Sequence, residues 1–246
     1  MKNFGRNPLL ALGGTLVAAL WLFTSTAQAA SPGAAQVKKV VGTATYTDAK
    51  GGGPIKEGDI LMQGATITTG AGSYVDLDMG VNGNALRVEA DSTLTLNKLD
   101  YTRAGEVIVN TELEVKKGST VANVVNKLSK ASKYEIKTAS GVAGIRGTKY
   151  MVKRDASRNV TRIVCTEGTV TFVDRGVTIT IGANQAYTPP AAGPSQAAVG
   201  VPTATETASL NAVATMLIQT SGDSNTGTSV TTSENNPSDT SVSVKP

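Results

Sequence analysis

The sequence from Thr138 to Val152 is TASGVAGIRGTKYMV, and this stretch decides the fold. Glycine reaches positive φ and lets two backbones approach closely, so the stretch predicts a bend between two strands. Residues 134–138 before it alternate apolar and charged side chains, the period of a half-buried strand. A second strand is expected over 148–153. The glycines recur at every third position, as Gly141, Gly144 and Gly147.

Arg146 lies between the last two of these glycines. One interpretation is structural, because a guanidinium group has five N–H donors and a tight corner leaves carbonyl oxygens to satisfy. The other interpretation is a contact with an anion, which the planar guanidinium also suits. We favour the structural role, and the anion contact stays open.

Short segments in which apolar and polar side chains alternate, separated by glycine, occur throughout the region 36–189. They predict an all-β domain of short antiparallel strands with Gly-rich turns, as a β-sandwich or a β-solenoid-like fold. Residues 119–132 fit both a helical stripe and a strand, and they stay unassigned. The clearest strands are expected at 37–47, in a hairpin of 74–79 with 85–90, in a hairpin of 160–166 with 169–173 through Glu167 and Gly168, and at 177–181.

Three parts of the chain carry a family resemblance: the central stretch, a Gly58-Asp59 pair followed by a Thr-Gly turn, and the closing run 181–187. Together they resemble the FecR-domain family over roughly residues 40–188. Asp59 is also suited, independently of any family, to cap backbone amides in a turn. The residues that carry the motif are Gly141, Gly144, Arg146, Gly147, Thr148, Gly58 and Asp59.

The resemblance implies a binding and signalling module. FecR proteins, as a family, relay the state of an outer-membrane receptor across the periplasm to a sigma factor. This sequence shows neither the cytoplasmic anti-sigma segment nor the retained transmembrane helix of that pattern. A sensing role would therefore need a protein partner.

Residues 1–30 have the three parts of a secretory signal peptide: basic Lys2 and Arg6, an apolar run over 9–23, and Ala27-Gln28-Ala29 as the cleavage signal. The apolar run is short for a membrane span. We expect a removed leader and a mature protein that is periplasmic or extracellular and has no membrane span. Residues 190–246 predict a low-complexity linker and a disordered tail, with a short helix at 203–220.

The composition argues against an enzyme. Histidine is absent, which removes the commonest general base and zinc ligand, and Cys165 is the one cysteine. We predict no catalytic residue, cofactor or metal. Acidic residues of the hairpin 74–90 could bind calcium or act as an acid/base pair, but a solvated sheet face is favoured. These residues are Asp76, Asp78, Glu89 and the adjoining Asp91.

Charge is strongly segregated along the chain. Residues 116–162 hold 12 basic and two acidic residues, a net charge of about +10. This basic segment could meet an anionic partner, or it could pack beside acidic strands of the same domain. Nucleic acid is not indicated, because aromatic residues for base stacking do not accompany the lysines. The candidate anion- or partner-binding residues are Lys133, Lys137, Arg146, Lys149, Lys153, Arg154 and Arg158.

Two functions follow from these patterns. The first is a non-enzymatic exported binding module of the cell envelope, with a sensory or regulatory role in signal transduction through a partner. The alternative is a secreted structural or adhesive envelope protein that binds an anionic polymer through the basic segment. The sequence does not predict the oligomeric state.

Overall fold

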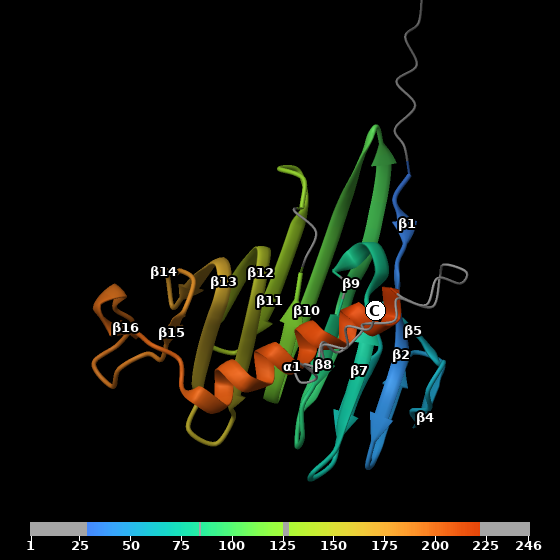
Figure 1. Ribbon diagram of the computed structural model, residues 1–246, viewed down its shortest axis with the longest axis horizontal. Coiled ribbons are helices and arrows are strands. Elements are labelled where there is room, and N and C mark those ends of the chain that lie inside the picture. The colour runs from blue at the N-terminus through green and yellow to red at the C-terminus, as the bar shows by residue number, and fades with distance from the viewer. Residues whose placement is uncertain (1–28, 84, 125–127, 222–246) are drawn as a thin grey trace, which may run out of the picture.

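The computed structural model describes residues 29–83, 85–124 and 128–221. The predicted leader lies almost wholly outside the described residues, as does the tail from residue 222 onward. Most of the described chain is β-strand, followed by one α-helix (Figure 1). The all-β prediction is confirmed.

The strands form one open, hydrogen-bonded sheet that folds over on itself into two layers. The helix-covered layer contains, in spatial order, β5 (Ile60–Met62), β2 (Ala34–Val41), β7 (Tyr74–Asp78), β8 (Ala85–Val88), the second halves of β10 (Glu106–Asn123) and β12 (Gly141–Asp155), the first half of β13 (Val160–Asp174), β15 (Gln185–Tyr187) and β16 (Val199–Gly200).

The opposite layer uses the remaining strands and the other halves of the three long ones. In order it contains β4 (Gly51–Pro54), β3 (Ala44–Asp48), β6 (Thr66–Thr69), β9 (Thr93–Ala104), β10, β11 (Lys133–Thr138), β12, β13 and β14 (Val177–Ile181), with the short β1 (Ser31–Pro32) beside β9. The β10 and β11 pair is parallel, whereas the sequence predicted antiparallel pairing.

Three long strands cross from one layer to the other at glycines with positive φ. The corners are Gly118 in β10 (φ 82°), Gly147 in β12 (φ 59°) and Gly168 in β13 (φ 78°). Such φ values place a Cβ in steric conflict in most L-residues, so glycine allows the strand to turn without ending. The ladder between β12 and β13 also shifts register between Arg146 and Tyr150, at the same corner.

These corners correct two local predictions. The stretch 138–152 is not a bend between two strands: the turn lies at residues 139 and 140, and the glycines fall inside β12. Glu167 and Gly168 do not close a hairpin, because β13 runs continuously through them. Both errors have one cause, since a positive-φ glycine serves a reversing turn and a corner equally well. The hairpin of β7 and β8 is confirmed.

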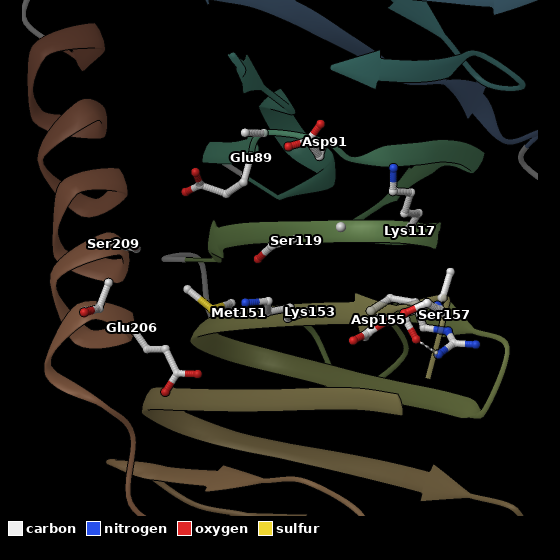
Figure 2. A pocket seen from close by; sticks show the side chains of 15 residues that line it. Glu89, Asp91, Lys117, Ser119, Met151, Lys153, Asp155, Ser157, Glu206 and Ser209 are labelled. Carbon is white, nitrogen blue, oxygen red and sulfur yellow. Dashed lines mark hydrogen bonds between the residues drawn. The ribbon is translucent and has the colours of Figure 1, made fainter. Parts of the chain in front are cut away.

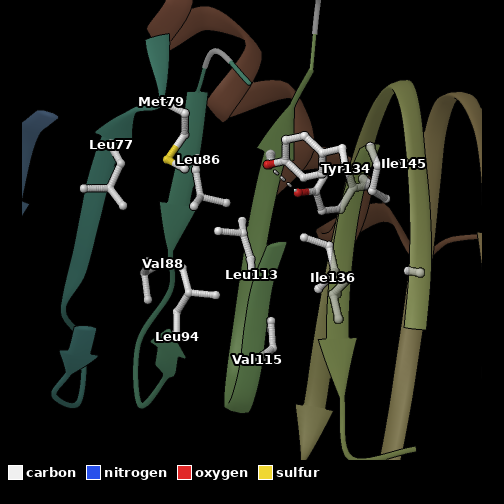
Figure 3. Close-up of a cluster of buried hydrophobic side chains, with 14 of the residues drawn as sticks. Leu77, Met79, Leu86, Val88, Leu94, Leu113, Val115, Tyr134, Ile136 and Ile145 are labelled. Atoms are coloured by element: carbon white, nitrogen blue, oxygen red, sulfur yellow. Dashed lines mark hydrogen bonds between the residues drawn. The ribbon is translucent and has the colours of Figure 1, made fainter. Parts of the chain in front are cut away.

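Aliphatic side chains from both layers fill the space between them (Figure 3). Leu77 and Leu86 point inward from the helix-covered layer, and Leu113 and Ile136 from the opposite layer; all four are fully buried. Burial of each such side chain contributes roughly 1.5–3 kcal/mol, so this shared core is what holds the two layers together.

Helix α1 (Ala204–Ser221) lies across the outer face of the helix-covered layer (Figure 1). It contacts β8, β10, β12 and β13. The sequence pattern indicated a short helix at 203–220, close to these bounds. Within the described residues, no helix combines the length and the apolar composition that a bilayer span requires.

Candidate functional site

Helix α1 covers a narrow apolar stripe on the outer face of the sheet. Among residues 204–215 of the helix, Leu210 and Val213 are the side chains buried against it. The remaining members of this cluster come from five strands and are Ala85, Val121, Met151, Val164 and Ala186. The stripe exists because β10, β12, β13 and β15 each place one apolar residue outward in register, and Ala85 of β8 lies two positions further along, opposite Asn123.

An ion pair fixes the first turn of α1 to the sheet. Nε and Nη2 of Arg162 in β13 donate to the two carboxylate oxygens of Glu206 at 2.5 and 2.9 Å. Glu206 also accepts from the backbone N–H of Thr203, and the Thr203 hydroxyl accepts from the N–H of Glu206. This reciprocal arrangement is a capping box. Arg162 and these N–H bonds lower the pKa of Glu206 to about 2.

A groove of about 510 Å³ opens beside the start of α1 (Figure 2). The helix contributes Glu206 and Ser209 to one wall, and Lys153 rises from β12 beside the floor. Met151 and Ser119 lie on the floor, on β12 and β10. The site therefore combines an apolar floor with charged groups of both signs at its rim.

Two polar groups at this groove lie in poorly solvated surroundings. Burial raises the pKa of Glu89, although Arg87 opposes that shift. The buried Oγ of Ser119 has no hydrogen-bond partner within the part of the chain that the structure describes. Buried polar atoms normally find a partner, so this hydroxyl is an unsatisfied polar group beneath the surface of the groove. The arrangement suits binding through mixed apolar and hydrogen-bonding contacts.

The acidic residues of the hairpin 74–90 have separate roles. Asp76 is almost fully buried and accepts from Arg87 Nε and Nη2 at 2.6 and 2.8 Å. The Arg87 guanidinium also lies 4.2 Å from the ring centre of Tyr74. Asp78 accepts from the N–H of Gly80, and only Glu89 and Asp91 line the groove. An acid/base pair of Asp76 with Asp78 or Glu89 is thus not assembled, because Arg87 holds Asp76.

The central motif shapes the fold. Gly147 makes the corner of β12, and a Cβ on Gly141 would collide with the carbonyl oxygen of Val173 in the neighbouring strand. A Cβ on Gly144 would meet its nearest atom at an ordinary 3.6 Å. Thr148, next to the corner, is buried.

Arg146 and Asp59 make the kinds of contact that their structural interpretations describe. Arg146 is exposed, and its Nη2 donates to the backbone carbonyl of Lys130 at 3.4 Å. Asp59 accepts from the N–H of Lys56 at 2.8 Å, and Gly58 has a φ of 89°. The Gly58-Asp59 pair closes the turn that leads into β5.

Three of the predicted basic residues pair with carboxylates of the same domain. Nζ–Oε distances are 2.8 Å for Lys137 to Glu112, 3.0 Å for Lys133 to Glu135 and 2.5 Å for Lys149 to Glu167. The basic segment is therefore neutralised in part by its neighbours in the sheet.

Apart from Arg146, the remaining three basic candidates lie near the end of β12. Lys153 is exposed at the groove, and Arg158 is exposed with Asp155 at 3.7 Å. Arg154 is buried and donates to the carbonyls of Asp155 and Val160 and to the side chain of Asn159, so it fixes the β12–β13 turn. The seven candidates do not form one patch.

Most of this groove is not indicated by the sequence. Glu89 and Asp91 stand out there only as carboxylates of the hairpin 74–90, and no sequence pattern marks Ser119, Met151 or Glu206 as site residues. The sequence does contain one relevant motif: Thr203 and Glu206 have the spacing of a capping box, which marks the start of α1. The sequence does not indicate the ion-pair partner of Glu206, since Arg162 lies 44 residues away.

The fold and the groove define a class: a two-layer β domain whose outer face binds a helix beside an open, mixed-charge groove. Residues 65–171 match the FecR family, described as FecR protein. The chain therefore contains a FecR domain, which confirms the resemblance of its central stretch.

Two solved structures, both described as a "putative anti-sigma factor" from Parabacteroides distasonis ATCC 8503, resemble this chain weakly. The TM-scores are 0.42 and 0.41, with 13% and 14% sequence identity. Each match covers 52% of this chain, and 57% or 56% of the other, so just over half of each known structure is matched. No curated protein sequence matches this chain.

Proposed function

We propose that this protein is a non-enzymatic, exported binding module that regulates or senses through a protein partner, and that the partner binds in the groove beside α1. The FecR domain supports a regulatory class of protein. The observation that carries the location is the groove itself, with its apolar floor at Met151 and the unpartnered hydroxyl of Ser119.

The chemistry of the groove describes what the partner must offer. An apolar side chain would cover Met151, and a polar group would bond to Ser119 once the atoms that bury its hydroxyl move aside. Glu89 and Lys153 at the rim would select for complementary charges, and such rim charges mainly affect association rate and specificity. The sequence of the leader supports an exported location, in the periplasm or outside the cell.

The alternative function is adhesion to an anionic envelope polymer. It is supported by the exposed Arg146, Lys153 and Arg158. It is weakened by the pairing of Lys137 and Lys149 with carboxylates of the same sheet. Retention of purified protein on isolated envelope glycan, lost when the three exposed residues are changed to glutamate, would favour this alternative.

The regulatory proposal is tested in the native cell. Deletion of the gene should change the abundance of a reproducible set of transcripts, and expression of the wild-type protein should restore it. Ser119→Trp fills the groove and should fail to restore the transcripts. Thr178→Trp adds the same bulk to the exposed face of β14, on the opposite layer, and should restore them.

Each outcome bears on a different part of the proposal. An unchanged transcript profile after deletion would contradict the regulatory role. Full restoration by Ser119→Trp would move the binding site away from the groove. Circular dichroism and thermal unfolding of both tryptophan variants establish that each one folds.

A further inference from the structure

The sheet has several edges, and most of them are closed to further strands. At β14, the side-chain amide of Gln196 bonds to both backbone groups of Thr180: Oε1 accepts from the N–H at 2.7 Å, and Nε2 donates to the carbonyl at 2.8 Å. At β4, Pro54 lacks an N–H. β16 has two residues, and Pro202 follows shortly after. Such devices prevent unwanted strand pairing.

The edge strand β5 lacks these devices. It pairs with β2 on one side, in the register Ala35 with Leu61, and no second strand pairs with it among the described residues. The N–H of Val37 donates to the carbonyl of Asp59 at 2.8 Å. Hydrogen-bonded pairs alternate along an antiparallel ladder, so Leu61 forms the next such pair. The N–H and C=O of Ile60 consequently point away from β2, toward the open side.

The side chains of β5 add an apolar surface to this open edge. Ile60 is 55% exposed and Met62 is 45% exposed, whereas Leu61 between them is buried in the core. A hollow of about 360 Å³ adjoins the strand, and Tyr46 and Pro54 contribute to its lining. An exposed apolar edge strand is a liability for a soluble protein unless another strand covers it.

We propose that β5 is a strand-pairing site for an extended segment of a partner protein. The segment hydrogen-bonds to the backbone of Ile60 and carries apolar residues at alternate positions, which cover Ile60 and Met62. That the partner is a protein is taken from the proposed function, and this inference rests on it. A second copy of the chain is the poorer occupant, because its own β5 offers three residues for pairing, whereas a free extended segment can also place side chains in the adjoining hollow.

The probe is a synthetic peptide of alternating valine and threonine with a lysine at each end, added to ¹⁵N-labelled mature protein. At about 1 mM peptide we expect amide shifts at β5 and β2, and slower hydrogen exchange at the Ile60 amide. Ile60→Pro removes the outward N–H without removing a bond to β2, and it should weaken peptide binding about fivefold, the net contribution of one hydrogen bond.

Ile60→Thr is the matched control, because it also shortens the side chain but keeps the N–H. It should bind the peptide more tightly than Ile60→Pro. Protection of the Ala35 amide in both variants establishes that β5 still pairs with β2. Met62→Lys places a charge over the edge and should also weaken binding.

Three outcomes would overturn the inference: no amide shifts at that peptide concentration, shifts confined to the groove beside α1, or equal binding by Ile60→Pro and Ile60→Thr. Shifts at β5 that depend on protein concentration without peptide would make a second copy the occupant and overturn the choice of partner. Ser119→Trp should leave peptide binding unchanged, so this test can fail or succeed independently of the transcript experiment.

Discussion

Arg162 in β13 and Glu206 in the first turn of α1 form a two-contact ion pair that joins the helix to the sheet. The pair is half-buried, and the Glu206 carboxylate also caps the helix through Thr203. The Glu206 side chain thus both caps the N-terminus of α1 and joins the helix to β13. In the first turns of α1, residues 204–215, Leu210 and Val213 are the buried apolar side chains, so Glu206 adds a polar contact that helps to hold this part of the helix against the sheet.

We predict that Glu206→Gln weakens the docking of α1 by about 1 kcal/mol, because the amide keeps the shape but loses the charge. The amide of Leu210 should then exchange about fivefold faster, as hydrogen exchange by NMR would measure. Glu106→Gln, at an exposed position of β10, removes the same charge and should leave that rate unchanged. Equal rates in both variants would contradict the role of the pair.

The same pair predicts a pH dependence. The pKa of Glu206 is lowered from 4.5 to about 2, so its contribution is complete above pH 4.5 and is lost as the pH falls toward 2. Exchange at Leu210 should therefore accelerate over this range in the wild-type protein more than in Glu206→Gln. Parallel profiles for the two proteins would show that another group controls the docking.

Gly168 and Gly144 should respond very differently to alanine. Gly168 has a φ of 78°, and a Cβ there would meet the carbonyl oxygen of Gly147 and, at 2.7 Å, Cγ2 of Thr148. Gly168→Ala should lower the free energy of unfolding by about 3 kcal/mol, from backbone strain and overpacking together. Gly144→Ala should change it by less than about 1 kcal/mol. Chemical denaturation measures both, and similar losses would contradict the corner assignment.

The fold was predictable where local pattern and burial coincide. Val75 and Leu77 alternate with Asp76, and this period led to the correct hairpin of β7 with β8. The long strands were not predictable, because Gly168 satisfies the requirements of a turn and of a corner alike. Only contact between the two layers decides between these two geometries.

The candidate site was less predictable, because it depends on register between distant strands. The charge of the basic segment is plain in the sequence, but the pairing of Lys137 with Glu112 follows from the parallel register of β11 on β10. The groove forms only where α1 packs beside β8, β10 and β12, which are far apart in the sequence. The residues around Ser119 and Met151 show no local sequence pattern that predicts this packing.

Cys165 should be chemically inert in the folded protein. It is fully buried, its Sγ donates to the Glu167 carbonyl at 3.2 Å, and burial raises its pKa to about 11. The thiolate is the reactive form of cysteine. A disulfide reagent at pH 8 should therefore react with Cys165 in the folded protein at least about a hundredfold more slowly than with Cys165 in protein unfolded by concentrated guanidinium chloride. Thr178→Cys supplies an exposed thiol as a control. Rapid reaction of Cys165 in the wild-type protein would contradict its burial.

Tyr134 and Tyr150 form a buried pair whose energy can be isolated. The Tyr150 hydroxyl donates to the Tyr134 hydroxyl at 3.2 Å, and the rings meet edge to face at 6.3 Å. Either single change to phenylalanine leaves one buried hydroxyl without this partner and should cost about 1–2 kcal/mol. The double change removes both hydroxyls and should cost less than the sum, with a coupling of about 1 kcal/mol from a double-mutant cycle.

The pair also predicts sensitivity to alkali. Burial raises the pKa of Tyr134 from 10 to about 12 and that of Tyr150 well above its ordinary value. The unfolded chain ionises first, so the stabilisation is complete below pH 10 and falls as the pH rises toward 12. The double phenylalanine variant should lose less stability than the wild-type protein over this range, measured by denaturation at each pH. An identical decline in both proteins would show that the buried hydroxyls do not control it.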